Sequence, residues 1–133
     1  MYLISPETLQ ALMKGNPDVL EKFEEFEAEI VMSSLVALDC YNAASQINNQ
    51  VLLSYYKTLF GSYKMLNFGN SESLIFARLK YDLHKAKNVL SDFDLMLAAQ
   101  ALAQNYTLVT TRTKTLEKLP NLELVDWSLN LVS

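Results

Sequence analysis

Residues 91–111 form the segment with the most apolar helical pattern of the chain, followed by a short β-branched run. From Leu95 to Ala103 almost no position requires contact with water, which is typical of a helix that is buried on most of its surface. Asn105 is predicted to cap this helix, because asparagine tolerates the left-handed backbone conformation. The β-branched run Thr107–Thr110 then predicts a short buried strand of the parallel type. We therefore expect this helix and strand to lie at the centre of the core.

The rest of the chain alternates short apolar runs with amphipathic helical patterns. The further predicted strands are Tyr2–Ile4, Glu29–Met32, Tyr63–Leu66 and Leu122–Trp127. Helices are predicted over about residues 5–14, 18–27, 33–44, 48–60 and 70–85. Strands that alternate with helices predict an α/β fold, in which helices cover both faces of a parallel sheet. We expect a single domain over residues 1–133.

The helix predicted over residues 70–85 has a mixed pattern. Its apolar positions, which we expect to face inward to varying degrees, are Leu74, Ala77, Leu79, Tyr81 and Leu83. Its far end is basic, with Arg78, Lys80, His84, Lys85 and Lys87. Basic residues near the last turn are expected from the helix dipole alone, and a role in nucleic-acid binding is the alternative. We expect the single histidine, His84, to lie on the surface.

Composition narrows the possible functions. The single cysteine, Cys40, excludes an intramolecular disulfide and a multi-cysteine zinc site, and it fits a reducing cytosol. The net charge of −4 provides no broad attraction for nucleic acid, so such binding would depend on a local basic patch or a metal. No apolar segment approaches the roughly 18 residues that span a bilayer. We therefore expect a cytoplasmic protein with no membrane partner.

Candidate chemistry gathers where the predicted strands end. In an open parallel sheet, ligands bind at the carboxyl ends of the strands. The side chains that follow those ends are Ser5, Glu7, Asp39, Asp94, Thr110, Thr111 and Arg112. Carboxylates that converge from distant positions are the ligands that Mg²⁺ or Mn²⁺ prefers. Such a site predicts metal-assisted attack of water on a phosphodiester. No local sequence motif by itself indicates this site.

Four segments together resemble a known family. They are Ser33–Asp39, Asp92–Ala99, Leu108–Thr110 and Leu124–Trp127. In this order they are similar to PIN domains, and more closely to the VapC-like toxins of bacterial type II toxin–antitoxin modules. The resemblance implies a three-layer α/β/α sandwich with a short-stranded, mostly parallel central sheet. It also implies descent from Mg²⁺- or Mn²⁺-dependent endoribonucleases, a neutralising antitoxin, RNA as the substrate and frequent homodimers.

The family's acidic positions are only half filled in this sequence. Ser5 stands where the first catalytic aspartate is expected, and Glu7 stands where the family has asparagine. Asp39 matches the second acid, which is usually glutamate, and Asp94 matches the third. The fourth acid falls at Thr111-Arg112, where neither residue is acidic.

Two interpretations follow from this pattern. In the first, the chain is a degenerate PIN domain whose metal-dependent ribonuclease activity is weak or lost, with no metal bound; Arg112 near a carboxylate then takes the electrostatic role of the metal. In the second, it is an active endoribonuclease in which Asp39, Asp94 and Glu7 are catalytic, and Asp39 and Asp94 hold Mg²⁺ or Mn²⁺. Ser5, Thr110, Thr111 and Arg112 line the site in both. Asp94 also fits the spacing of a helix-capping carboxylate.

Overall fold

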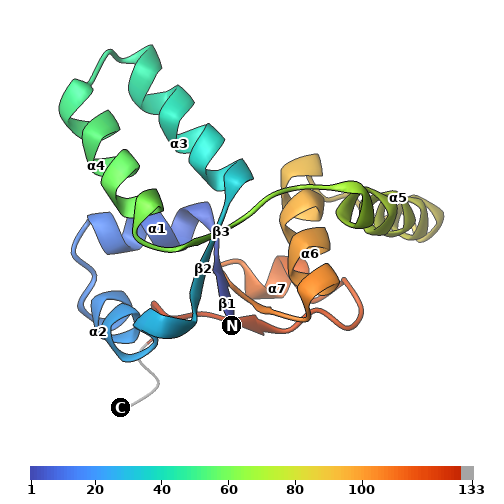
Figure 1. Cartoon of the computed structure of the whole chain (residues 1–133). Helices are drawn as coiled ribbons and strands as arrows, with labels where there is room; N and C mark the ends of the chain where they lie inside the picture. The colour runs from blue at the N-terminus through green and yellow to red at the C-terminus, as the bar shows by residue number, and fades with distance from the viewer. Residues whose placement is uncertain (130–133) are drawn as a thin grey trace.

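Five short strands form one parallel sheet in the computed structural model, which describes residues 1–129 (Figure 1). Their order across the sheet is β3-β2-β1-β4-β5, and each of the four pairings is parallel. The strands are β1 (Tyr2–Ile4), β2 (Ile30–Ser33), β3 (Lys64–Leu66), β4 (Thr107–Val109) and β5 (Leu124–Val125). β1 lies at the centre, so the residues that follow β1 and its neighbour β4 come together at one edge.

Helices connect the strands and cover both faces of the sheet. They are α1 (Pro6–Met13), α2 (Pro17–Glu25), α3 (Ser34–Gln46), α4 (Gln50–Gly61), α5 (Asn70–Lys85), α6 (Asp92–Gln104) and α7 (Thr113–Leu116), with a 3₁₀ turn at Glu27–Glu29. In β1, Ile4 packs with residues of α1 to α4 in one core cluster. Its neighbour Leu3 packs with residues of α5 to α7 in another. Since successive strand residues point to opposite faces, these two clusters confirm the three-layer α/β/α sandwich.

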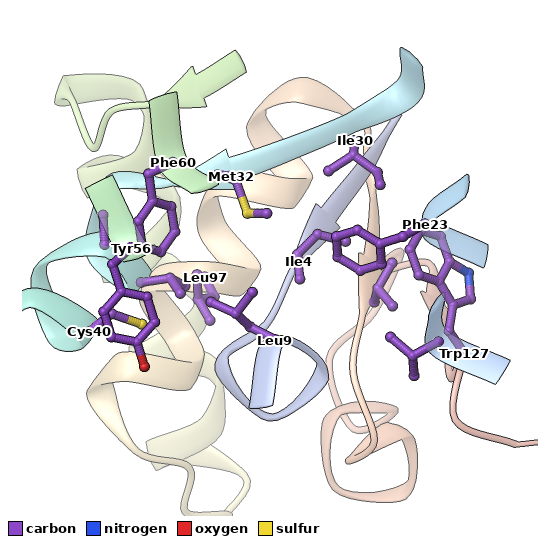
Figure 2. Packing of buried hydrophobic residues seen from close by; sticks show 14 of the residues in the cluster. Ile4, Leu9, Phe23, Ile30, Met32, Cys40, Tyr56, Phe60, Leu97 and Trp127 are labelled. Atoms are coloured by element: carbon purple, nitrogen blue, oxygen red, sulfur yellow. The ribbon is translucent and has the colours of Figure 1, made fainter. Parts of the chain in front are cut away.

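The first core cluster is rich in aromatic side chains, and Figure 2 shows its two ends. At one end, Trp127 packs edge-on against Phe23, with ring centroids 5.7 Å apart. At the other end, Tyr56 and Phe60 of α4 pack in the same cluster as buried residues of α3, the helix with which α4 forms a hairpin. These two rings are therefore core residues.

The helix expected to be central to the core is α6. Leu95, Leu97 and Ala98 are buried in it, which confirms its position. The helix ends at Asn105, whose φ of 58° and ψ of 43° are left-handed, so the predicted cap is confirmed. The observed bounds of β2 to β5 differ from the predicted strands by one or two residues at their ends.

The prediction for α5 is wrong at three positions. Leu74 and Tyr81 are 67% and 55% exposed, and Ala77 is exposed as well. Only Leu79 and Leu83 among the five predicted positions are buried. The reason is that α5 packs chiefly against α6, so a single narrow face of the helix is covered. His84 lies on the surface, as predicted. None of the described helices is both long enough and apolar enough to cross a bilayer.

Candidate functional site

Ser5 follows β1 and begins α1. Its hydroxyl accepts a hydrogen bond from the backbone N–H of Thr8 at 3.3 Å and donates to the Thr8 hydroxyl at 3.0 Å. Pro6 occupies the first helical position, where its missing N–H costs nothing. Ser5 is only 2% exposed. Its oxygen is therefore used to cap the helix, at the place where the family resemblance predicted a catalytic aspartate.

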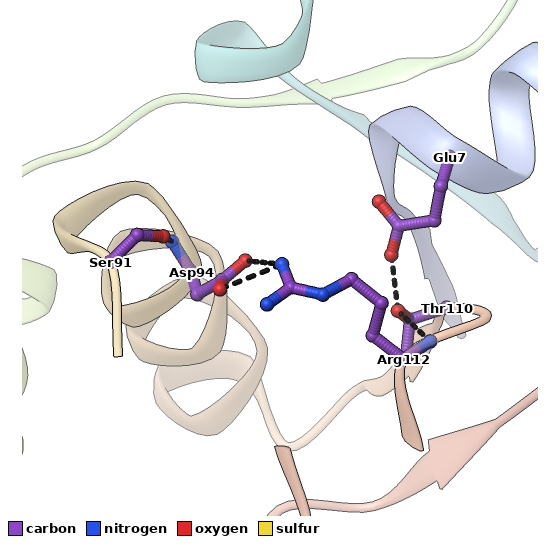
Figure 3. Close-up of polar contacts among 5 residues, drawn as sticks. All are labelled: Glu7, Ser91, Asp94, Thr110 and Arg112. Atoms are coloured by element: carbon purple, nitrogen blue, oxygen red, sulfur yellow. Dashed lines mark hydrogen bonds and ion pairs between the residues drawn. The ribbon is translucent and has the colours of Figure 1, made fainter. Parts of the chain in front are cut away.

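Asp94 lies in the first turn of α6, where Ser91 caps the helix. The Ser91 hydroxyl accepts from the backbone N–H of Asp94 at 3.1 Å. Asp94 is 8% exposed. Its carboxylate points to Arg112, whose Nη1 lies 2.8 Å from both carboxylate oxygens. The proposed capping function of the carboxylate is thus carried by Ser91 instead, and the carboxylate is free to pair with arginine. Figure 3 shows the Arg112 side chain reaching across from the turn after β4.

Thr110 and Glu7 extend this contact to the other side of the turn. The backbone N–H of Arg112 donates to the Thr110 hydroxyl at 3.0 Å, and that hydroxyl donates to Oε1 of Glu7. We call Glu7, Thr110, Arg112 and Asp94 the Asp94 network. It joins α1, the end of β4 and the start of α6 through hydrogen bonds and the Arg112–Asp94 ion pair (Figure 3). Two carboxylates and one guanidinium give the network a formal charge of −1.

Asp39 and Thr111 lie outside this network. Both are exposed, Asp39 on α3 and Thr111 at the turn after β4. No hydrogen bond or ion pair within residues 1–129 joins Asp39 to Asp94 or Arg112. The structure therefore connects Glu7, Thr110, Arg112 and Asp94, places Ser5 on the neighbouring strand end, and leaves Asp39 separate.

A resident Mg²⁺ or Mn²⁺ does not fit the donor set that the described residues present. These residues contain no group of three or more His, Cys, Asp or Glu side chains that could hold a metal ion. Hard divalent cations take six or more oxygen ligands and favour clustered carboxylates. Here the oxygens of Asp94 are bonded to Arg112 and one oxygen of Glu7 to Thr110. In this arrangement these three carboxylate oxygens bond to Arg112 and Thr110 and not to a metal.

Sequence reasoning overlooked one polar residue near the strand ends, Gln100. It lies in the apolar part of α6 and is fully buried. Its Oε1 accepts from the Ser33 hydroxyl at 2.5 Å, and its Nε2 donates to the backbone carbonyl of Leu66 at 3.3 Å. Gln100 thereby ties the ends of β2 and β3 to α6. The available signal was an amide in the middle of the apolar run Leu95–Ala103, since a buried amide needs partners.

Cys40 is a small buried side chain. Burial raises the pKa of its thiol from 9.0 to about 11, and the negative charge of Asp39 acts in the same direction, while a hydrogen bond with Tyr56 opposes the rise. Burial also raises the pKa of the Tyr56 phenol. A thiol with so high a pKa is protonated at neutral pH and is a poor nucleophile.

No family model matches the chain, but individual proteins are similar to it. Ribonuclease VapC of Rickettsia bellii is 33% identical over 73 residues, a match that covers 55% of this chain and 52% of that protein, or about half of each. Ribonuclease VapC1 of Rickettsia felis is 25% identical over 130 residues, which cover 92% of this chain and 93% of that protein.

A solved structure has the same fold at lower sequence identity. The DNA-bound VapBC structure from Salmonella typhimurium aligns with a TM-score of 0.87 over 95% of this chain and 97% of that one, at 17% identity. The likeness at this identity concerns the fold. Together with the two similar ribonucleases, it confirms the resemblance to VapC-like PIN domains that the sequence motifs indicated.

Proposed function

We propose that the chain functions as a VapC-like PIN-domain protein of the toxin–antitoxin type, with metal-dependent endoribonuclease activity that is weak or lost. One observation carries the second half of this proposal. Nη1 of Arg112 lies 2.8 Å from both oxygens of Asp94, the acid that matches the family best. The similar proteins named ribonuclease VapC support the first half.

Competition between Arg112 and a divalent ion explains the proposed loss of activity. A hydrolytic metal site needs ionised carboxylates that are free to bind the metal, so that the ion can polarise the phosphoryl oxygen and activate water. An arginine stays charged at all relevant pH values and forms strong, charge-assisted bonds with carboxylates. Because Arg112 is part of the chain, its local concentration at Asp94 is about millimolar or higher. A metal would have to displace it.

An antitoxin is the protein partner that we propose for this chain. The similar solved structure is a VapBC complex with DNA, which supports an antitoxin partner by resemblance. A homodimer, contact with RNA and a cytoplasmic location are further parts of the proposal that rest on the family resemblance and the sequence. With a net charge of −4, the chain does not attract RNA as a whole. Contact with RNA would therefore be local.

A second candidate is the active endoribonuclease that uses Glu7, Asp39 and Asp94. One observation favours it: Glu7 reaches the end of β4 and is bonded to Thr110, two residues from Arg112. Two carboxylates thus approach the same turn from opposite sides (Figure 3). This candidate requires Arg112 to release Asp94 when metal and RNA bind.

Cleavage of a mixed RNA pool separates the two candidates. The full chain is incubated with Mg²⁺ or Mn²⁺ beside Asp94→Asn and a matched control, Asp92→Asn, which changes an exposed acid in the same helical turn. We expect the wild type to cleave far less RNA than a variant in which the family's acids are present. The double variant Ser5→Asp/Arg112→Asp, which restores the two family acids, should gain metal-dependent cleavage and so shows that the assay detects it. Metal-dependent cleavage by the wild type and Asp92→Asn that is as fast as cleavage by the double variant, and that Asp94→Asn abolishes, would overturn the proposal.

A further inference from the structure

A small pocket lies between the end of α5 and the start of α6, two helices that pack side by side (Figure 1). Its volume is about 230 Å³, which is less than the roughly 300–1,000 Å³ of sites for drug-sized ligands. Leu83 and Leu95 are buried and give it an apolar floor. The full lining is Lys80, Leu83, His84, Asn88, Val89, Leu90 and Leu95. A pocket of this size, with an apolar floor and polar residues around it, fits one planar ring with polar edges.

The surface around this pocket is basic, although the whole chain has a net charge of −4. Residues 78–92 contain four of the eleven Lys and Arg residues and two acids, which gives this segment a formal charge of +2. Both acids are paired with cations of the same segment, at 3.4 and 2.7 Å. Lys85 and Lys87 are exposed, and they form no ion pair or side-chain hydrogen bond within residues 1–129. Their charges are therefore available to an anionic partner.

The end of α5 does not need a lysine at position 87. The carbonyl of Leu83 accepts from the N–H of Asn88 at 2.9 Å, and that of His84 accepts from the N–H of Lys87 at 3.1 Å. In this Schellman arrangement, the residue after the cap has a left-handed backbone and is usually glycine. That residue is Lys87, with a φ of 59°. The helix dipole favours Lys85 in the last turn, but its effect falls off beyond that turn. Since glycine would be less strained, local structure does not explain Lys87.

The pocket adjoins the Asp94 network. Leu95, which lines the pocket, follows Asp94 in the first part of α6. Lys80 reaches the same part of the helix, because its Nζ lies 2.7 Å from Oδ1 of Asp92. A nucleic-acid strand that places one base in the pocket therefore lies beside the turn that carries Asp94.

We infer that this pocket is a binding site that holds one unpaired nucleotide of single-stranded RNA. The base lies on the apolar floor and against the ring of His84, since unpaired bases stack on planar side chains. The phosphates lie beside Lys85 and Lys87, whose charges attract them whatever the sequence. A base-paired nucleotide is excluded, because its base is stacked within the duplex. The inference deepens the proposed contact with RNA and rests on it, and it gives that contact a place on the molecule.

Fluorescence anisotropy with a labelled oligouridylate of about 12 nucleotides tests this site. The protein is kept in EDTA, so that binding is measured without metal-dependent cleavage. We expect the wild type to bind with a Kd of about 100 μM or lower at about 50 mM salt. Lys85→Gln/Lys87→Gln should weaken binding about tenfold. It should also reduce the slope of log affinity against log salt by about 1.4, because each phosphate contact contributes about 0.7.

Lys57→Gln/Lys118→Gln is the matched control. It removes two exposed lysines that do not line the pocket and that form no ion pair within residues 1–129. It should change the affinity by less than about twofold and leave the salt slope unchanged. His84→Ala should weaken binding about fivefold through lost stacking.

Lys87→Gly separates binding from structure. Glycine relieves the left-handed strain, so the melting temperature should not fall, whereas the affinity for RNA should. In the wild type, bound RNA should shift the NMR signals of the Asn88 and Val89 amides. Unchanged signals with RNA bound, or tighter binding of a duplex of the same length, would overturn the inference.

The inference and the proposed function fail in different ways. Equal losses of affinity in the two double lysine variants refute the pocket and leave the proposed contact with RNA in place. A wild type that binds no oligonucleotide refutes both the pocket and that contact. Binding through the pocket supports the inference whether or not the protein cleaves RNA.

Discussion

Replacement of Gln100 by leucine removes a buried amide that connects three elements. The side chain is fully buried and bonded to the Ser33 hydroxyl at 2.5 Å and to the Leu66 carbonyl at 3.3 Å. Gln100→Leu keeps the approximate volume but leaves both partners without their bond. Each unsatisfied buried group costs about 1–3 kcal/mol, and the added apolar burial returns about 1 kcal/mol. We expect the free energy of unfolding to fall by about 2 kcal/mol.

Urea unfolding followed by circular dichroism measures this loss. Gln104→Leu, at the exposed end of the same helix, is the matched control and should change stability by no more than about 0.5 kcal/mol. Ser33→Ala also costs stability, because Ser33 caps α3 through the N–H of Leu35 at 3.1 Å. The double variant Gln100→Leu/Ser33→Ala should cost about 1 kcal/mol less than the sum of the two, since the Ser33 hydroxyl is then absent and only the Leu66 carbonyl is left without its bond. Equal effects of Gln100→Leu and Gln104→Leu, or strictly additive losses, would refute the reasoning.

Two further predictions concern the thiol and the cap of α6. Burial raises the pKa of the Cys40 thiol from 9.0 to about 11. The protonated thiol therefore favours the folded state below pH 9, and this contribution to stability is lost as the pH rises toward 11. Urea unfolding at several pH values should show that the stability of the wild type falls more steeply over this range than that of Cys40→Ala. Asn105 has a left-handed backbone with a φ of 58°, which alanine adopts at a cost and glycine adopts freely. Asn105→Ala should therefore lower the free energy of unfolding by about 1 kcal/mol, whereas Asn105→Gly should change it little. Equal losses in both variants would show that the left-handed backbone is not the cause.

The sequence predicted the fold where local signals and burial agreed. The apolar run of α6, the left-handed Asn105 and the short strand Tyr2–Ile4 are all confirmed, because each of these segments is surrounded by other elements in the way its pattern requires. The prediction that Leu74 and Tyr81 of α5 face inward was wrong, because apolar residues alone do not reveal how many neighbours a helix has.

The candidate site was predictable as a set of residues but not as a set of bonds. The positions of Asp94 and Arg112 beside the ends of the predicted strands indicated that they could approach each other, and Nη1 of Arg112 lies 2.8 Å from the Asp94 carboxylate. The direction of Glu7 could not be predicted from a turn that begins with proline, and the bond to Thr110 depends on how α1 packs beside β4. Gln100 was overlooked because hydrophobic periodicity does not show which polar side chain finds partners across a sheet.

The central claim is that Arg112, and not a divalent ion, neutralises Asp94 in the native protein. Crystals grown in Mn²⁺, with diffraction data collected at a wavelength where manganese scatters anomalously, test it most directly. The account predicts no anomalous peak at Asp94 and Nη1 of Arg112 within hydrogen-bond distance of both carboxylate oxygens. A manganese peak coordinated by Asp94, with the Arg112 side chain turned away, would contradict it.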